Sequence, residues 1–412
     1  MKRVLMVAFH FPPLAAGSGI QRTLRFVQHL PAFGWQPIVV SADPRVYERV
    51  GGDLLAEVPA DVPVQRSFAL DAARHLSIGG RYLGWTARPD RWVSWQWAAV
   101  RDGLRLIAQH RPDAIWSTYP IATAHRIGAR LQRRSGLPWV ADFRDPMAQD
   151  GYPADPAVWR SFQKIEAEAV GRAACSVFTT PGAARTYRAR YPDAADRITV
   201  VENGYDEESF AGLGAGGAPL VPGRLTLLHS GVVYPSERDP GPLFAALAGL
   251  LASGRLPRDR LRLRFRATGH DELLLGLIAR HGVADVVEVC PPLPYREALA
   301  EMTRADGLLV LQAANCNEQI PAKLYEYLRA ERPILGLTDP AGDTAGALRA
   351  AGIDAIGRLD QVAGIEAALT TFVDALAQGR AALPQPEAVR QSARRQRSAA
   401  LAAVLDRITG SR

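Results

Sequence analysis

The chain has 412 residues, 48% hydrophobic and 22% charged, a composition typical of globular proteins and unlike that of disordered or fibrous ones. At about 100–200 residues per domain, this length predicts two domains. No stretch reaches the about 18 consecutive apolar residues of a membrane-spanning helix, and the apolar part of the N-terminus is too short for a signal peptide, so we expect a cytoplasmic protein. The cysteines, Cys175, Cys290 and Cys316, are few, odd in number and far apart. This pattern excludes a disulfide framework and a zinc-binding spacing, and we expect small buried apolar residues instead.

The charge balance is mildly basic: 49 Lys and Arg against 42 Asp and Glu give a net charge of +7. Only three of the cations are lysines, Lys2, Lys164 and Lys323, so a lysine is more informative here than an arginine. The excess permits contact with anionic lipid headgroups or phosphate-bearing substrates. There is no basic tail, zinc-finger spacing or helix-turn-helix signature, so nucleic acid is not an expected partner.

The first forty residues predict a strand, a glycine-containing loop, a helix and a second strand. Residues 3–9 and 36–42 are continuous apolar runs, as buried parallel strands are. Between them, the loop HFPPLAAGSG leads into residues 20–30, whose apolar positions recur at helical spacing. Such a βαβ unit is the element of a doubly wound α/β domain.

Strands and helices continue to alternate along the rest of the chain. A glycine-rich segment, 211–223, interrupts them and indicates a connection between domains. We therefore expect an N-terminal domain over 1–208, a connection over 209–224, a C-terminal domain over 225–385 and a final helix over 386–412. The further strands are expected at 113–118, 137–143, 173–180, 198–201, 225–230, 261–268, 286–289, 307–312 and 333–338.

Two segments leave a surface role open. The final helix has an apolar side over 401–408 and a basic N-terminal half, so it either packs with a solvated basic face or contacts a membrane surface. Four of the eight tryptophans crowd into residues 85–97. They form either a satellite core or an amphipathic surface suited to a membrane interface or a ligand pocket.

The most specific motif lies in residues 317–336, NEQIPAKLYEYLRAERPILG. Glu318 and Glu326 are eight apart, Pro321 stands where a helix would begin, and Lys323 and Glu326 are three apart on one helical face. A helix N-terminus beside a lysine suits a diphosphate, and a carboxylate one turn further can accept hydrogen bonds from ribose hydroxyls. The alternative is a solvated Lys–Glu pair on a helix surface.

Together with this motif, four others in order make the chain resemble the GT-B glycosyltransferases, close to glycosyltransferase family 4: FHFPPLAAGSGIQR, GLPWVADFRDP, VENGYDEESF and HSGVVYPSERDP. The resemblance implies an α/β fold of two Rossmann-like doubly wound domains facing each other across a cleft, with the final helix crossing back to the N-terminal domain. It also implies retaining transfer of a sugar from a UDP- or GDP-sugar, held mainly by the C-terminal domain, to an acceptor on the N-terminal domain. No metal ion or other cofactor is expected.

On the donor side, the resemblance makes Glu326 the ribose-binding carboxylate and Glu318 the acid that contacts the donor sugar. The family's first arginine is absent, since Val232 follows Gly231. Its diphosphate-binding lysine is expected some six residues later, and Arg238 stands near that position.

We therefore expect Arg238 and Lys323 to neutralise the leaving diphosphate. The alternative for Arg238 is a surface ion pair with Glu237 or Asp239. The expected donor-binding residues are Gly231, Arg238, Glu318, Lys323, Leu324 and Glu326, of which Glu318, Arg238 and Lys323 are also expected to be catalytic.

On the acceptor side, Gly17 and Gly19 lie between the first strand and the first helix, where small residues let the backbone approach a ligand. The spacing is not a dinucleotide fingerprint, because Arg22 stands at the third glycine. The resemblance places this loop in the sugar-transfer cleft and makes Arg22 a candidate phosphate ligand. A plain turn before a capped helix is the alternative.

The segment ADFRDP sets Asp142 and Asp145 around Arg144 at the end of a strand. Family members commonly have a histidine where Arg144 stands, and arginine cannot act as a base at neutral pH. Any side-chain base is therefore Asp142 or Asp145, or none is needed because the leaving phosphate accepts the acceptor's proton. We count Arg144 and Asp145 among the catalytic candidates; an internal salt bridge is the alternative.

These observations predict a glycosyltransferase, hexosyltransferase in type, that builds a cell-surface polysaccharide or glycolipid on a lipid-linked or glycan acceptor. We expect it in the cytoplasm, with possible peripheral contact to an anionic membrane at its inner face. A sugar-nucleotide epimerase or hydrolase of the same fold and an inactive glycan- or nucleotide-binding scaffold are the alternatives.

Overall fold

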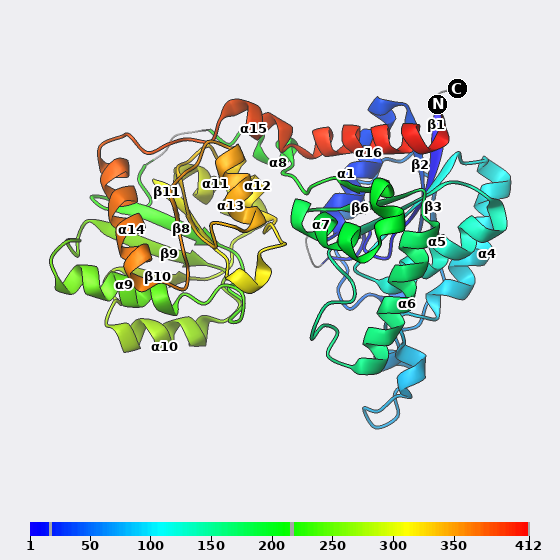
Figure 1. The fold of residues 1–412 in the computed structure, drawn as a ribbon, viewed down its shortest axis with the longest axis horizontal. Helices are drawn as coiled ribbons and strands as arrows, with labels where there is room; N and C mark the ends of the chain where they lie inside the picture. The colour runs from blue at the N-terminus through cyan, green and yellow to red at the C-terminus, as the bar shows by residue number, and fades with distance from the viewer. Residues whose placement is uncertain (16–18, 215–217, 411–412) are drawn as a thin grey trace. The chain divides into compact units, whose positions relative to one another are not determined.

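In the computed structural model the chain divides into two units, each a parallel sheet with helices on both faces (Figure 1). Unit 1 comprises Met1–Asn203 with Arg394–Arg412, and unit 2 comprises Gly204–Ala393. The expected pair of doubly wound, Rossmann-like domains is confirmed. The structure describes all residues except 16–18, 215–217 and 411–412.

Unit 1 has a seven-stranded sheet in the order β3-β2-β1-β4-β5-β6-β7. Its strands are β1 (Lys2–Val7), β2 (Trp35–Ala42), β3 (Val64–Ser67), β4 (Ala114–Thr118), β5 (Trp139–Arg144), β6 (Cys175–Phe178) and β7 (Ile198–Val200). Its helices are α1 (Gly19–His29), α2 (Asp53–Ala56), α3 (Ala72–His75), α4 (Trp95–His110), α5 (Ala122–Ser135), α6 (Pro156–Arg172), α7 (Pro181–Arg190) and α16 (Arg394–Thr409), with short 3-10 turns η1 (Leu30–Phe33), η2 (Pro44–Val46), η3 (Gly84–Ala87) and η4 (Pro192–Arg197).

The central strand β1 shows why its sequence is apolar throughout. Val4 and Met6 point into a core formed with α1 and α16, whereas Leu5 and Val7 point into the core under α4 and α5. Because successive side chains of a strand alternate between faces, a sheet covered on both faces needs an unbroken apolar run.

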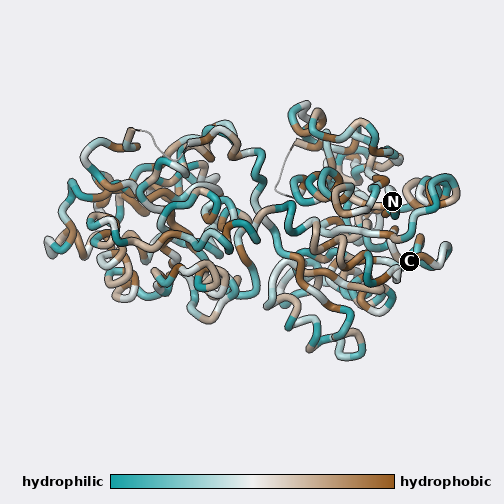
Figure 2. Tube along the Cα trace, turned by 90° about the horizontal axis from the view of Figure 1, so that it is seen from above, coloured by the Kyte–Doolittle hydropathy of each residue, from teal (hydrophilic) through white to brown (hydrophobic). Residues whose placement is uncertain are grey.

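Unit 2 has a six-stranded sheet in the order β10-β9-β8-β11-β12-β13. In Figure 2, hydrophobic segments run through the interior of each unit. The strands of unit 2 are β8 (Leu225–Ser230), β9 (Leu261–Arg266), β10 (Val287–Cys290), β11 (Gly307–Leu311), β12 (Ile334–Leu337) and β13 (Ile356–Gly357). Its helices are α8 (Glu207–Phe210), α9 (Gly241–Ala252), α10 (Asp271–His281), α11 (Tyr295–Arg304), α12 (Lys323–Arg329), α13 (Asp343–Ala350), α14 (Val362–Ala377) and α15 (Pro386–Gln391), with the 3-10 turn η5 (Ala314–Cys316).

The borders of the two units differ in detail from the expected ones. Residues 204–208 lie in unit 2, where the backbone of Tyr205 pairs with Ala393 and its amide donates to Ser392 O at 3.1 Å. The final segment forms two helices rather than one, α15 in unit 2 and α16 in unit 1. Part of the expected connection, 215–217, lies outside the described residues.

Burial answers part of each open question about the surface segments. Leu401 and Leu405 of α16 pack into the core of unit 1, and Arg397 pairs with Glu202, so this helix is a packing element. The tryptophan cluster is divided: two members, Trp92 and Trp95, pack into the core, whereas the other two are exposed. The exposed pair is Trp85 and Trp97. No helix among the described residues is long and apolar enough to cross a membrane.

Candidate active site

The strand order of unit 2 indicates where on its sheet a ligand would bind. The chain runs from β8 to β9 and β10 on one side and then returns to add β11, β12 and β13 on the other. Loops diverge where the order reverses, so a crevice forms at the carboxyl ends of β8 and β11. Gly231 directly follows β8, and Lys323 begins the helix that follows β11.

Lys323 is held at this edge by a histidine of β8. The Nζ of Lys323 lies 2.8 Å from Nε2 of His229, and Nδ1 of His229 lies 3.0 Å from the carbonyl oxygen of Leu309 in β11. A carbonyl can only accept, so Nδ1 carries the hydrogen and Nε2 accepts from the lysine. Burial, and then the charge of Lys323, hold the pKa of His229 well below its ordinary value. The histidine is therefore a neutral acceptor that orients the lysine.

Two cations converge here. Burial, and then the charge of Arg238, hold the pKa of Lys323 well below its ordinary value. The Nη1 of Arg238 donates to Val232 O at 2.8 Å, and its guanidinium lies 5.0 Å from the ring centroid of Tyr234. The alternative ion pair of Arg238 with Glu237 or Asp239 is not among the ion pairs of the described residues. Two cations that repel each other near a strand end favour an anion beside them.

Gly231 leaves the space that the lysine occupies. Its φ of +112° is rarely adopted by residues with a side chain, and its amide donates to Arg266 O at 2.8 Å. A Cβ at this position would lie 3.2 Å from the Nζ of Lys323. Glycine thus suits the backbone, and a side chain here would press against the end of the lysine.

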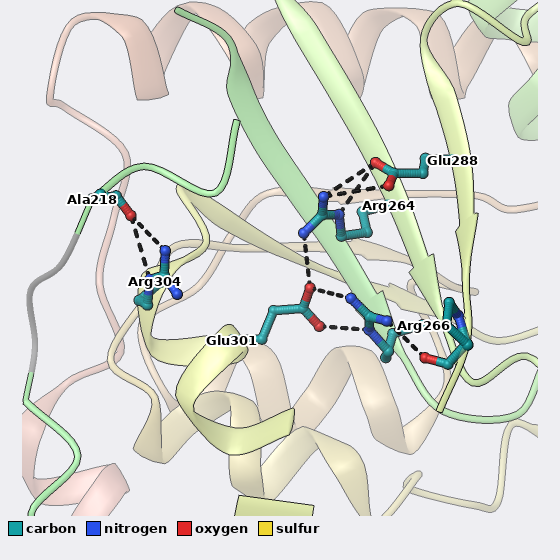
Figure 3. Close-up of polar contacts among 7 residues, drawn as sticks. Ala218, Arg264, Arg266, Glu288, Glu301 and Arg304 are labelled. Atoms are coloured by element: carbon teal, nitrogen blue, oxygen red, sulfur yellow. Dashed lines mark hydrogen bonds and ion pairs between the residues drawn. The ribbon is translucent and has the colours of Figure 1, made fainter. Parts of the chain in front are cut away.

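Glu326 receives a hydrogen bond from a tyrosine that the sequence did not single out. The hydroxyl of Tyr295, the first residue of α11, donates to Oε1 of Glu326 at 2.8 Å. Helix α11 is anchored to β9 through Glu301, whose Oε2 accepts from Nε of Arg266 at 2.8 Å and whose Oε1 accepts from Nη1 of Arg264 at 2.9 Å (Figure 3). This buried network therefore fixes the helix that presents Tyr295 to Glu326.

Glu318 is exposed in the loop between η5 and α12. The buried amide of Gln312, just after β11, shapes this loop by donating to Cys316 O at 2.7 Å and to Gln319 O at 3.0 Å. Thr344 Oγ1 also donates to Gln319 O, at 3.0 Å. The loop conformation around Glu318 is thus set from the strand end.

Two expectations about α12 are corrected. The helix begins at Lys323, two residues after Pro321, and spans only seven residues. The amide of Leu324 donates to Pro321 O at 2.9 Å, so its N–H is occupied within the turn. The side chain of Leu324 is fully buried in the core of unit 2, so it has no accessible atom to offer a donor. Side chains supply charge at this edge, from Lys323 and Arg238.

In unit 1, the expected roles of Arg22 and Asp142 are also corrected. Arg22 is 2% exposed and its guanidinium donates from Nε and Nη2 to the two oxygens of Asp142 at 3.0 and 2.9 Å. Its remaining N–H groups donate to Val201 O, Glu202 O and Asn203 Oδ1. All five donors are used and Asp142 is fully buried, so the two side chains form an internal salt bridge, with Arg22 as the partner of Asp142 in place of the expected Arg144.

The other N-terminal candidates lie at the carboxyl edge of the unit 1 sheet. Arg144 follows a bulge in β5, has a φ of +62° and donates from Nη1 to Tyr119 O at 3.4 Å. A Cβ on Gly19 would lie 2.8 Å from that Nη1 and 3.0 Å from Nδ1 of His10, so the glycine makes room for both side chains. Burial, and then the charge of Arg144, lower the pKa of His10 to about 4. Asp145 is exposed at the same edge.

Gly17 lies outside the described residues.

Four site residues were missed by the sequence analysis, His10, His229, Tyr295 and Gln312. Three of them share a weak signal, because His10, His229 and Gln312 are polar residues at or just after the end of an otherwise apolar strand. Tyr295 carries no such signal.

Comparisons with known proteins concern the family and the fold. Residues 18–204 match the family model described as a glycosyl transferase 4-like domain. Many solved structures match the chain, and three of those that match nearly its whole length are the following. A glycosyltransferase from Rickettsia africae has a TM-score of 0.66 at 11% identity, covering 100% of this chain and 99% of that one. HepE of Anabaena in complex with UDP has a TM-score of 0.65 at 12% identity, covering 99% and 100%.

Sucrose-phosphate synthase from Thermosynechococcus elongatus has a TM-score of 0.61 at 14% identity, covering 99% and 97%. No curated protein sequence matches the chain. At such identities the solved structures establish the fold, which is GT-B. The match over residues 18–204 and the fold of the whole chain are thus both similar to those of GT-B glycosyltransferases.

Proposed function

We propose that the chain transfers a hexose from a UDP- or GDP-sugar, with retention of anomeric configuration and without a metal ion, to a lipid-linked or polysaccharide acceptor of the cell surface. The observation that carries the proposal is the pair Lys323 and Arg238 at the strand-order reversal of unit 2, with Lys323 oriented by a neutral histidine. HepE, which shares the fold, has been solved with UDP, with UDP and glucose and with UDP-glucose, which supports a nucleotide-sugar donor.

The negative charge of the leaving diphosphate determines the role of Lys323 and Arg238. When the bond between the anomeric carbon and the phosphate oxygen breaks, negative charge grows on the diphosphate. Lys323 and Arg238 stabilise that charge without reorganising, because His229 and Val232 O already hold them.

The carboxylates of unit 2 bind the rest of the donor. Glu326 accepts hydrogen bonds from the ribose hydroxyls, with Tyr295 fixing the carboxylate that receives them. Glu318, exposed on its loop, contacts hydroxyls of the donor sugar.

The proton of the acceptor hydroxyl passes to the departing phosphate oxygen as the acceptor oxygen bonds to the anomeric carbon. This route needs no side-chain base. It agrees with unit 1, where Asp142 is committed to Arg22 and Arg144 cannot act as a base. Arg144 and Asp145 then serve to bind sugar or phosphate groups.

The experiment incubates the purified chain with radiolabelled UDP-, GDP- and dTDP-sugars and a lipid extract, with and without a chelator. Label in the lipid or polymer fraction, undiminished by the chelator, is the expected result. Free labelled sugar alone would indicate a hydrolase, an epimerised donor would indicate an epimerase, and nucleotide binding without turnover would indicate a scaffold. Lys323→Met should abolish transfer, and Lys164→Met, a lysine exposed on unit 1, is the matched control.

A further inference from the structure

One loop of unit 1 projects from its sheet and carries several exposed apolar side chains. It runs from α3 to the segment before α4, over residues 72–91, and extends away from the sheet as the light blue loop at the bottom of Figure 1. Its neck is closed: the amide of Ala72 donates to Arg91 O at 2.8 Å, and Arg91 pairs with the buried Asp71 at 3.2 Å. Such a closed loop is held in place by its base, whatever its far end contacts.

The far end is a tight hairpin. Ile78 and Arg81 exchange backbone hydrogen bonds of 2.8 and 3.1 Å across Gly79 and Gly80. These glycines have φ values of +57° and +77°, as the two central residues of a type I′ turn do. The turn leaves Ile78 at the tip with 88% of its surface exposed.

The loop presents large apolar side chains to solvent. Besides Ile78, Leu83 is 63% exposed and Trp85 is 70% exposed, and Leu76 and Tyr82 are also exposed. Apolar residues concentrated on one projecting segment mark a surface that another body covers.

The charge of the loop indicates the nature of that body. Residues 72–89 contain no Asp or Glu, whereas Arg81 and Arg88 are exposed. Tryptophan and tyrosine beside arginine, with aliphatic residues at the tip, suit the boundary between lipid headgroups and acyl chains. A protein surface with both an apolar and an acidic patch would be needed to match the same loop.

We propose that loop 72–91 is a membrane-docking element that inserts Ile78, Leu83 and Trp85 into the interface of an anionic lipid bilayer, with Arg81 and Arg88 at the level of the headgroup phosphates. The inference does not depend on the proposed transferase activity. It gives a physical basis for the peripheral membrane contact expected from the net charge, and it assigns that contact to the loop instead of the final helix.

The test is partition of the full chain into vesicles of phosphatidylcholine with and without phosphatidylglycerol, measured by flotation. The loop variant is Ile78→Ser with Leu83→Ser and Trp85→Ser. The control variant is Leu275→Ser with Leu383→Ser, two exposed leucines of unit 2. We expect the native chain and the control to float with the anionic vesicles and the loop variant to lose on the order of tenfold or more in partition.

A second readout locates the contact. Lipids brominated in their acyl chains should quench part of the tryptophan fluorescence of the native chain, and Trp85→Phe should remove that part. Arg81→Ser with Arg88→Ser should weaken binding at low salt and have little effect at high salt, where exposed charges are screened. Thermal unfolding of each variant checks that the fold is kept.

Four results would overturn the proposal. The first three are a native chain that floats with neither vesicle, a loop variant that binds as the native chain does, and quenching that survives Trp85→Phe. If sedimentation shows that the native chain self-associates and the loop variant does not, the loop binds a second copy of the chain and the membrane assignment is wrong.

Discussion

The Nζ of Lys323 lies 2.8 Å from Nε2 of His229, a residue 94 positions earlier in the chain. Because Nδ1 of the same ring donates to Leu309 O, the ring orientation is set by β8 and β11 together. The lysine is thus positioned by the sheet and not only by its own seven-residue helix.

The first prediction tests this relationship. His229→Phe removes the acceptor and should weaken UDP binding by about ten- to a hundredfold, since a hydrogen bond to a charged group contributes about 1.5–3 kcal/mol. In a Lys323→Met background the same change should lower the affinity for UDP by less than about twofold. Calorimetry on the four proteins measures the coupling.

His229→Gln is the conservative control, because its amide oxygen can replace the Nε2 acceptor and should restore most of the affinity. If His229→Phe weakens binding equally in both backgrounds, the histidine does not act through the lysine.

A second prediction concerns protons. The pKa of Lys323 is held well below its ordinary value by burial and by Arg238, and a bound diphosphate raises it. Between the pKa of the free protein and that of the complex, binding should take up a proton, so affinity should fall as pH rises through the pKa of the complex. Calorimetry in buffers of different ionisation enthalpy counts the protons. Proton uptake that persists unchanged in Lys323→Met would show that Lys323 is not the group that takes up the proton.

The third prediction uses a pair of glycines with positive φ. Gly231→Ala places a Cβ against Lys323 and should weaken UDP binding about tenfold in addition to straining the backbone by about 1–3 kcal/mol. Gly254 also has a positive φ, but no atom lies within 4 Å of the position that a Cβ would take there, so Gly254→Ala should lose stability and keep its affinity. Equal affinities for both variants would show that the lysine has room to move.

A fourth prediction separates structure from binding in unit 1. Arg22→Ala leaves the buried Asp142 unpaired and should lower the free energy of unfolding by about 3–5 kcal/mol. The double change Arg22→Met with Asp142→Leu should recover part of this loss. Urea unfolding followed by circular dichroism gives the stability, and UDP affinity should stay within about twofold of the native value. An Arg22→Ala protein of native stability that no longer binds UDP would restore the phosphate-binding role.

Most of the fold could be read from local pattern. β1, β8 and β11 are buried on both faces, so their apolar runs identify them without any knowledge of their partners. The edge strands β3 and β13 were missed, because they are short and half-covered and so need no such run. The same local logic located Lys323 near a strand end, where parallel sheets place their ligands, whereas Arg238 and Gly231 were expected from the family resemblance.

The sequence by itself determined two doubly wound domains and the chemical character of the edge around Lys323, since both depend on short-range apolar and charge patterns. Only the tertiary structure decided which polar side chains already have hydrogen-bond partners within the protein. Arg22 and Asp142 are 120 positions apart and satisfy each other, whereas His229 and Tyr295 each reach across the fold to orient a binding residue. A hydrogen bond depends on distance and direction in space, and nothing in the local sequence encodes the partner that folding brings to it.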